Sequence, residues 1–293
     1  MARRPNDGLR AISLSMNRPH YLPNPDRLSV LAAVMALAYL STHFIQFPGR
    51  QFALQLPGLY LTLTLNAQTV IGLLVAGLAA SGTTWLLSDH PDFAAESVAE
   101  SAAHRYQLSW VLPAVLAGVA EMLLAQLPFG LQWWLGMAAS SGLMILILTA
   151  EYIAVDIEDV RFPLASAGLN AAAFALLLFW ASALRAANVR LYVILPALAL
   201  AGGAVSLRAL YLRLHGSWDL VTAAIIAILL SQFAAALHYW PLAPVTYGLL
   251  IMGAAYALTS LIGALAEGKT WRQALAEPGL ALLTCLVVAW LTR

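Results

Sequence analysis

Residues 66–88, NAQTVIGLLVAGLAASGTTWLLS, are 23 consecutive positions without a charged side chain. A helix needs about 20 mostly apolar residues to cross the hydrocarbon layer of a bilayer, so this run predicts a membrane-spanning helix. The whole chain has the same character, because 61% of its 293 residues are hydrophobic, only 10% are charged, and the mean hydropathy is +0.79. A soluble globular domain carries about 25% charged residues. We therefore predict an all-α polytopic membrane protein.

Nine apolar runs reach the length of a membrane span, and short connections rich in proline, glycine and charge separate them. The predicted spans are 29–47, 66–88, 108–127, 131–152, 163–184, 190–212, 218–239, 243–265 and 271–291. A basic N-terminal tail, residues 1–28, holds five arginines and leads into the first span without a cleavage site. We expect this tail to be cytoplasmic and residues 29–293 to form a single helical transmembrane domain.

The distribution of basic residues predicts the orientation. With the N-terminus inside, eleven of the fifteen Lys and Arg residues fall on the cytoplasmic side and four on the outer side. This bias follows the positive-inside rule. All nine tryptophans fall near the ends of predicted spans, where aromatic belts form. The prediction is nine spans with the N-terminus inside and the C-terminus outside.

The stretch 51–65, QFALQLPGLYLTLTL, alternates with period two, which is typical of a strand. Pro57-Gly58 divides it, so we expect a short outer-side β-hairpin-like element between the first two spans. Tyr60, Thr62 and Thr64 lie opposite the leucine positions and are the candidate docking surface. A free strand edge can pair with another chain.

Glu121 lies in the third span, within VLAGVAEMLLAQLP at 115–128. A charged carboxylate near the bilayer centre costs about 2.5–3.5 kcal/mol on insertion scales. A proton or cation site would explain its position. A protonated acid bonded to a neighbouring Asn, Ser or Tyr, or one close to the outer headgroups, is the favoured explanation.

Two histidines at the outer ends of spans, His43 and His238, could join Glu121 in a metal site or act as haem ligands. Histidines at the end of a span are usually interfacial, and the sequence does not identify a cofactor. The acidic segment 151–162 is expected to be a solvated loop, and Arg208 is expected to extend to the membrane interface. Interhelical hydrogen bonds are expected for the other polar residues within spans, which include Asn170, Gln232, Tyr247, Tyr256, Thr259 and Ser260.

Several sequence motifs are absent. The chain has no G-x-x-x-x-G-K-[ST] loop, no H-E-x-x-H motif and no G-x-S-x-G elbow. Its only lysine, Lys269, lies in a loop, which excludes a retinal Schiff base within a span. No basic patch with interleaved aromatic residues predicts nucleic acid as a partner. The expected partners are the lipid bilayer and other membrane subunits.

Three segments, FPGRQFALQLPGLYLTLTLNAQT at 47–69, WLLSDHP at 85–91 and HYWPLAPVTYGLL at 238–250, resemble an uncharacterised family of bacterial polytopic membrane proteins. The resemblance implies a bacterial inner-membrane protein and supplies no catalytic residues.

The leading hypothesis is a non-enzymatic accessory or scaffolding subunit of a larger membrane assembly. A transporter or channel that uses Glu121 is the second hypothesis. An intramembrane enzyme or cofactor-binding protein that uses His43 and His238 is the third.

Overall fold

The computed structural model describes the chain apart from residues 1–21, 46–47, 57–58, 66, 91–107, 189, 215–218 and 292–293, and describes only the backbone of residues 42–43, 50–56, 59–65 and 69. Its elements in chain order are α2 (Pro25–Phe44), β1 (Arg50–Leu56), β2 (Leu59–Leu65), α3 (Ala67–Leu87), α5 (Val111–Leu124), α6 (Leu131–Ile153), α7 (Phe162–Ala186), α8 (Leu191–Arg213), α9 (Leu220–His238), α10 (Pro244–Ala266), α11 (Trp271–Ala274) and α12 (Ala276–Leu291).

Seven helices in the described part of the chain are long and apolar enough to cross a membrane, which is compatible with a multi-pass membrane protein. They are α3, α6, α7, α8, α9, α10 and the continuous run of α11 and α12. This is two fewer than the nine predicted spans. The first predicted span corresponds to the 20-residue helix α2, in which the side chains of residues 42–43 lie outside the described part of the chain. The third predicted span, 108–127, corresponds to α5, which is only 14 residues long. Helix α5 ends at Leu124, and turns follow before Pro128.

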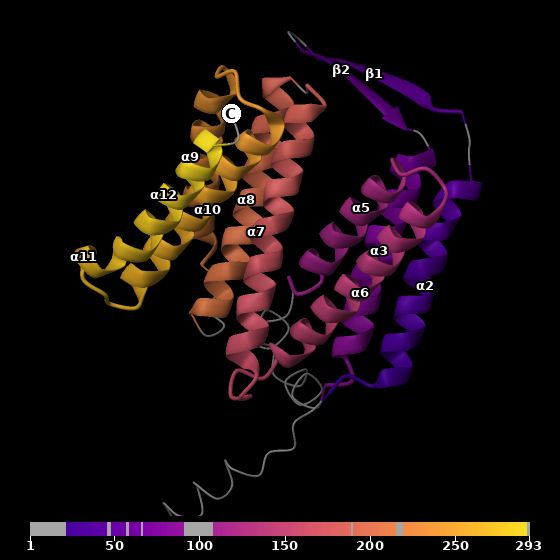
Figure 1. Cartoon of the computed structure of the whole chain (residues 1–293), viewed down its shortest axis with the longest axis horizontal. Coiled ribbons are helices and arrows are strands. Elements are labelled where there is room, and N and C mark those ends of the chain that lie inside the picture. The colour runs from indigo at the N-terminus through magenta and orange to yellow at the C-terminus, as the bar shows by residue number, and fades with distance from the viewer. Residues whose placement is uncertain are drawn as a thin grey trace, which may run out of the picture.

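The helices pack as two groups that meet along α7 (Figure 1). Helices α2, α3, α5 and α6 enclose one hydrophobic core, in which Met35, Val75 and Trp133 are almost fully buried. Helices α8, α9 and α10 enclose the other core, around Leu198 and Leu230. Helix α7 contributes to both cores, with Leu169 and Ala173 in the first and Leu177 and Ala181 in the second.

Local capping fixes the helix ends near the second core. The Asp219 side chain accepts a hydrogen bond of 2.9 Å from the Thr222 backbone N–H and caps the N-terminus of α9. This contact lowers the pKa of the Asp219 carboxyl, because the Thr222 hydroxyl and backbone N–H both donate to it. After α10, Gly268 takes a left-handed conformation with φ of +79°, which only glycine adopts without strain. Thr270 then forms a capping box with Gln273 and starts α11.

The backbones of residues 50–56 and 59–65 form two antiparallel strands, β1 and β2. Their register pairs Phe52 with Leu63 and Leu54 with Leu61, and it pairs Gln55 with Tyr60. In Figure 1 the strands lie beyond the same end of the helices as the C-terminus. The side chains of Tyr60, Thr62 and Thr64 lie outside the described residues, as do the turn residues 57–58.

Candidate functional site

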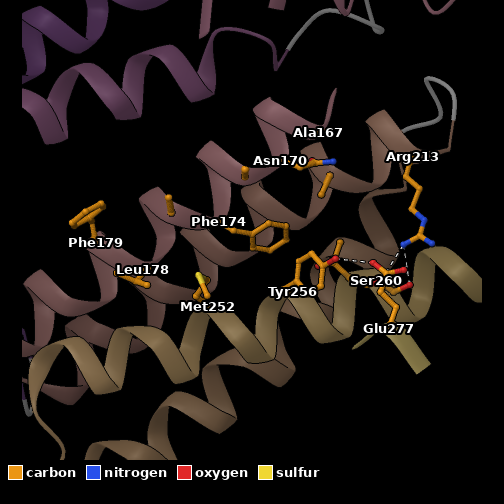
Figure 2. A pocket seen from close by; sticks show the side chains of 14 residues that line it. Ala167, Asn170, Phe174, Leu178, Phe179, Arg213, Met252, Tyr256, Ser260 and Glu277 are labelled. Atoms are coloured by element: carbon orange, nitrogen blue, oxygen red, sulfur yellow. Dashed lines mark hydrogen bonds between the residues drawn. The ribbon is translucent and has the colours of Figure 1, made fainter. Parts of the chain in front are cut away.

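A cavity of about 700 Å³ lies between α7, α8, α10 and α12 (Figure 2). Its wall consists of Ala167, Asn170, Ala171, Phe174, Ala175, Leu178, Phe179, Ala209, Arg213, Met252, Tyr256, Thr259, Ser260 and Glu277. Figure 2 shows Phe179 and Leu178 at one end and Arg213 and Glu277 at the other. The cavity is therefore apolar over most of its length and polar at one end.

The apolar wall follows from the sequence of α7. Ala167, Ala171 and Ala175 recur every four residues, so they share one face of the helix. All three are exposed although they line the cavity, which means that the cavity opens to the outside along this face. Their methyl side chains leave the space that larger residues would fill. Phe174 and Leu178 supply the bulk of the adjoining surface.

The polar end is built where α8 and α10 terminate. Arg213, the last residue of α8, donates to both carboxylate oxygens of Glu267, at 2.5 Å from Nε and 3.4 Å from Nη2. Its Nη1 donates to the Ser260 carbonyl at 3.1 Å and to the Ser260 hydroxyl at 3.2 Å. A β-carbon at Gly263 would lie 2.7 Å from the Arg213 Cδ atom. The glycine therefore gives the arginine side chain its path to Glu267.

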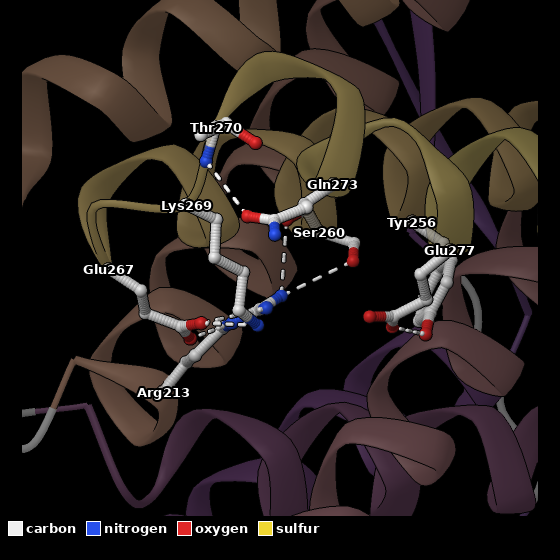
Figure 3. Close-up of polar contacts among 8 residues, drawn as sticks. All are labelled: Arg213, Tyr256, Ser260, Glu267, Lys269, Thr270, Gln273 and Glu277. Atoms are coloured by element: carbon white, nitrogen blue, oxygen red, sulfur yellow. Dashed lines mark hydrogen bonds and ion pairs between the residues drawn. The ribbon is translucent and has the colours of Figure 1, made fainter.

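Glu267 forms ion pairs with both Arg213 and Lys269, because the Lys269 ammonium also lies 2.8 Å from the Glu267 Oε2 atom (Figure 3). The hydrogen bond from Arg213, followed by that from Lys269, lowers the pKa of the Glu267 carboxyl to about 2. The carboxylate is therefore ionised at neutral pH. It neutralises the guanidinium that faces the cavity.

Glu277 has a different environment on the opposite side of the polar end (Figure 3). The Tyr256 hydroxyl donates to Glu277 Oε1 at 2.7 Å, and no base lies within ion-pair distance of Glu277 in the described part of the chain. The Tyr256 ring stands edge-on to Phe174 with centroids 5.3 Å apart. Nearby, the Asn170 Oδ1 atom is buried without a hydrogen-bond partner.

A second candidate site surrounds Glu121 on α5, which is only 2% exposed. Among the described residues, its Oε1 atom has no hydrogen-bond partner, and neither has the buried Tyr39 hydroxyl on α2. A β-carbon at Gly72 on α3 would lie 2.9 Å from Glu121 Oε2, so the glycine leaves room for the carboxyl. Glu121 is therefore enclosed by protein. The predicted hydrogen bond from a neighbouring side chain to Oε1 is not found among the described residues.

Glu151 and Arg208 correct two predictions. Glu151 was expected in a solvated loop, but it lies within α6 and is 1% exposed. Arg208 was expected to extend to the interface, but it lies within α8, is 8% exposed, and donates through Nη2 to Glu151 Oε2. Its guanidinium also lies 5.3 Å from the Tyr211 ring centroid. This buried ion pair joins the two helix groups.

A family model for proteins of unknown function (DUF5656) matches residues 47–292 of the chain. The chain belongs to this family. The DUF5656 match covers every residue that lines the cavity, together with Glu121, Glu151 and Arg208. No similarity to a curated protein or to a solved structure is found.

His238, which was predicted as a possible ligand, is the last residue of α9 and takes part in contacts that hold the following turn. Arg185 at the end of α7 donates to the His238 carbonyl and to the Trp240 carbonyl, each at 3.0 Å, and so holds the turn between α9 and α10. Its Nη1 also lies 3.5 Å from His238 Nδ1. The His43 side chain lies outside the described residues. Among the described residues, no group of three or more His, Cys, Asp or Glu could hold a metal ion.

The cavity is not evident from the amino-acid sequence. Asn170, Tyr256, Thr259 and Ser260 were predicted to form interhelical hydrogen bonds. Three of them do so: Thr259 with Ser206 at 2.9 Å, Tyr256 with Glu277 at 2.7 Å, and Ser260 with Arg213 at 3.2 Å. Nothing in the spacing of these residues shows that they line a common space. The four-residue recurrence of alanines in α7 was the one available signal, and Ala-rich membrane helices often show it by chance.

Proposed function

We propose that this chain is an integral membrane protein that binds a lipid-like amphiphile in the cavity between α7, α8, α10 and α12. The supporting observation is the division of the cavity wall into a long apolar part and one polar end. A volume of about 700 Å³ is within the usual range of ligand pockets, about 300–1,000 Å³, and suits a head group with part of one chain. In this role the protein is a non-enzymatic subunit of a larger membrane assembly.

The proposed topology has nine passes in a bacterial cytoplasmic membrane, with the N-terminus inside and the C-terminus outside. The bias of basic residues supports it. In this orientation Arg213 and Lys269 lie at the cytoplasmic side, so the head group would lie in the inner leaflet. Strands β1 and β2 would lie on the outer side, and Tyr60, Thr62 and Thr64 would offer a docking surface to another subunit.

Filling the cavity should prevent lipid binding. Ala171→Trp places an indole against the cavity wall, whereas Leu164→Trp adds the same group to α7 at a position that is 80% exposed and does not line the cavity. The measurement is photo-crosslinking of the protein in liposomes by a phospholipid that carries a diazirine in one chain, with adducts located by mass spectrometry. We expect adducts on cavity residues of α7 and α10 in the wild type, an at least tenfold loss with Ala171→Trp, and no loss with Leu164→Trp. Equal labelling of both variants at these residues would contradict lipid binding in the cavity.

Proton transport through Glu121 is a second candidate function, because the buried Glu121 Oε1 atom and the buried Tyr39 hydroxyl both lack hydrogen-bond partners. A carboxyl within a membrane span that has no partner is expected to carry its proton or to exchange it.

The expected result for Glu121→Gln is the loss of voltage-driven proton uptake by proteoliposomes, measured with an internal pH-sensitive dye. The amide has the same size and cannot release a proton. Glu158→Gln, a change of the same kind at an exposed acid between α6 and α7, should leave the uptake at the wild-type rate. Uptake by Glu121→Gln at the wild-type rate would remove Glu121 from the mechanism.

A further inference from the structure

The charge at the polar end of the cavity is unevenly compensated. Arg213 and Glu277 are the charged residues of the cavity wall. Glu267 binds the guanidinium of Arg213 through both of its oxygens, so the positive charge is already paired. Glu277 receives hydrogen bonds from the neutral hydroxyls of Tyr256 and Ser260. Glu277 is therefore the charged residue of the cavity wall that has no ion-pair partner among the described residues.

At the polar end of the cavity, the groups that can form further hydrogen bonds are acceptors, namely oxygens of Glu277 and Asn170. A carboxylate offers about four acceptor positions, and two donors to Glu277 leave about half of them open. The Asn170 Oδ1 atom is buried and has no donor. Buried acceptors in native proteins nearly always have a donor, either from the protein or from a bound molecule. Glu277 is exposed, so only the Asn170 oxygen is a buried acceptor, and a ligand that supplies N–H or O–H groups can donate to both residues.

Aromatic rings complete the polar end. Tyr256 and Phe174 both line the cavity, and their rings meet edge to face at 5.3 Å. Aromatic faces attract cations through the quadrupole of the ring. A cationic head group would therefore meet favourable contacts from the rings as well as from the carboxylate.

Resting on the proposed lipid binding, we infer that the cavity selects an amphiphile whose head group is a protonated primary amine, held by Glu277 and Asn170. An ammonium supplies one positive charge and three donors, which matches one carboxylate and one unpaired amide oxygen. A phosphate or carboxylate at the end of the ligand would face Glu277 with the same charge. A trimethylammonium would supply the charge without any donor. The amine can belong to an aminophospholipid or to a free long-chain amine.

Competition against the diazirine phospholipid tests this inference on the full-length protein. The competitors are phosphatidylethanolamine, phosphatidylcholine and phosphatidylglycerol with identical acyl chains, and separately dodecylamine and dodecanol. We expect phosphatidylethanolamine to halve the labelling of the cavity at a concentration at least tenfold lower than either other phospholipid. Dodecylamine is expected to compete at least tenfold better than dodecanol if the binding site accepts a free amine. A preference for the amine in either set supports the inference, and the set that shows it identifies the source.

The matched variants are Glu277→Gln, which keeps the size and removes the charge, and Glu158→Gln as the control. The preference for the amine should fall to less than threefold with Glu277→Gln and stay unchanged with Glu158→Gln. Asn170→Leu serves as a second variant and should reduce the preference without abolishing labelling. If all competitors displace the probe equally from wild-type protein, the inference is wrong while lipid binding stands. If the cavity is not labelled at all, the proposed function itself fails.

Discussion

Replacing Arg208 by methionine is expected to lower the free energy of unfolding by about 3–5 kcal/mol, because a buried ion pair that loses one partner leaves an uncompensated charge. Glu151 is 1% exposed, and its Oε1 atom already lacks a hydrogen-bond partner. Without the guanidinium no described residue donates to its carboxylate. The measurement is the unfolding of purified protein by a denaturing detergent, followed by tryptophan fluorescence.

The double variant Arg208→Met with Glu151→Met is the control for this prediction. Replacing both members of a buried pair by apolar residues of similar volume is often neutral or even stabilising. We expect the double variant to recover most of the stability that Arg208→Met loses. A double variant as unstable as the single one would show that packing of the Arg208 side chain, for example against Tyr211, matters more than its charge.

Gly248→Ala is expected to destabilise the contact between α7 and α10 by about 1–3 kcal/mol, the usual effect of overpacking. A β-carbon at Gly248 would lie 2.6 Å from the Leu178 carbonyl oxygen and 3.2 Å from the Ser182 backbone nitrogen, and it would also overlap the Ser182 hydroxyl. Backbone atoms of α7 cannot move aside as a side chain can. The two helices would therefore separate, and the thermal unfolding midpoint should fall.

Gly142→Ala provides the matched control, because no atom lies within 4 Å of a β-carbon at Gly142 on α6. Alanine favours a helix over glycine by about 1 kcal/mol. The control should thus be as stable as the wild type or slightly more stable. If Gly248→Ala behaved like Gly142→Ala, the close approach of α10 to α7 would be refuted.

Local properties of the chain predict its helices well. The predicted span 243–265 and the observed α10 (Pro244–Ala266) differ by one residue at each end, and the prediction 163–184 agrees similarly with α7 (Phe162–Ala186). Pro163 and Pro244 lie in the first turns of α7 and α10, where proline is favoured, so the starts of these helices follow from local sequence. The third span was predicted too long, because hydropathy continues to Leu127 whereas the helical backbone stops at Leu124.

Contacts between distant residues could not be predicted in this way. Glu151 and Arg208 are 57 residues apart, and Arg213 and Glu267 are 54 apart. Hydrophobic periodicity shows which face of a helix is apolar, but it does not show which helix lies against that face. The cavity depends on four helices, so its existence follows from their packing and not from any one segment. The position of Glu121 within an apolar run was evident from the sequence, whereas its proximity to Gly72 was not.

The position of α7 in both hydrophobic cores means that the cavity cannot change width independently of the rest of the molecule. Its Ala171 face borders the cavity, while Leu169 and Ala173 pack in the core with α2, α3, α5 and α6. Packed cores have low compressibility and transmit displacement. A ligand that pushes α7 outward would therefore press it against the N-terminal helices, where Arg208 and Glu151 already tie α8 to α6. Helix α7 is thus shared by the cavity wall and by the hydrophobic core that includes α5, the helix of Glu121.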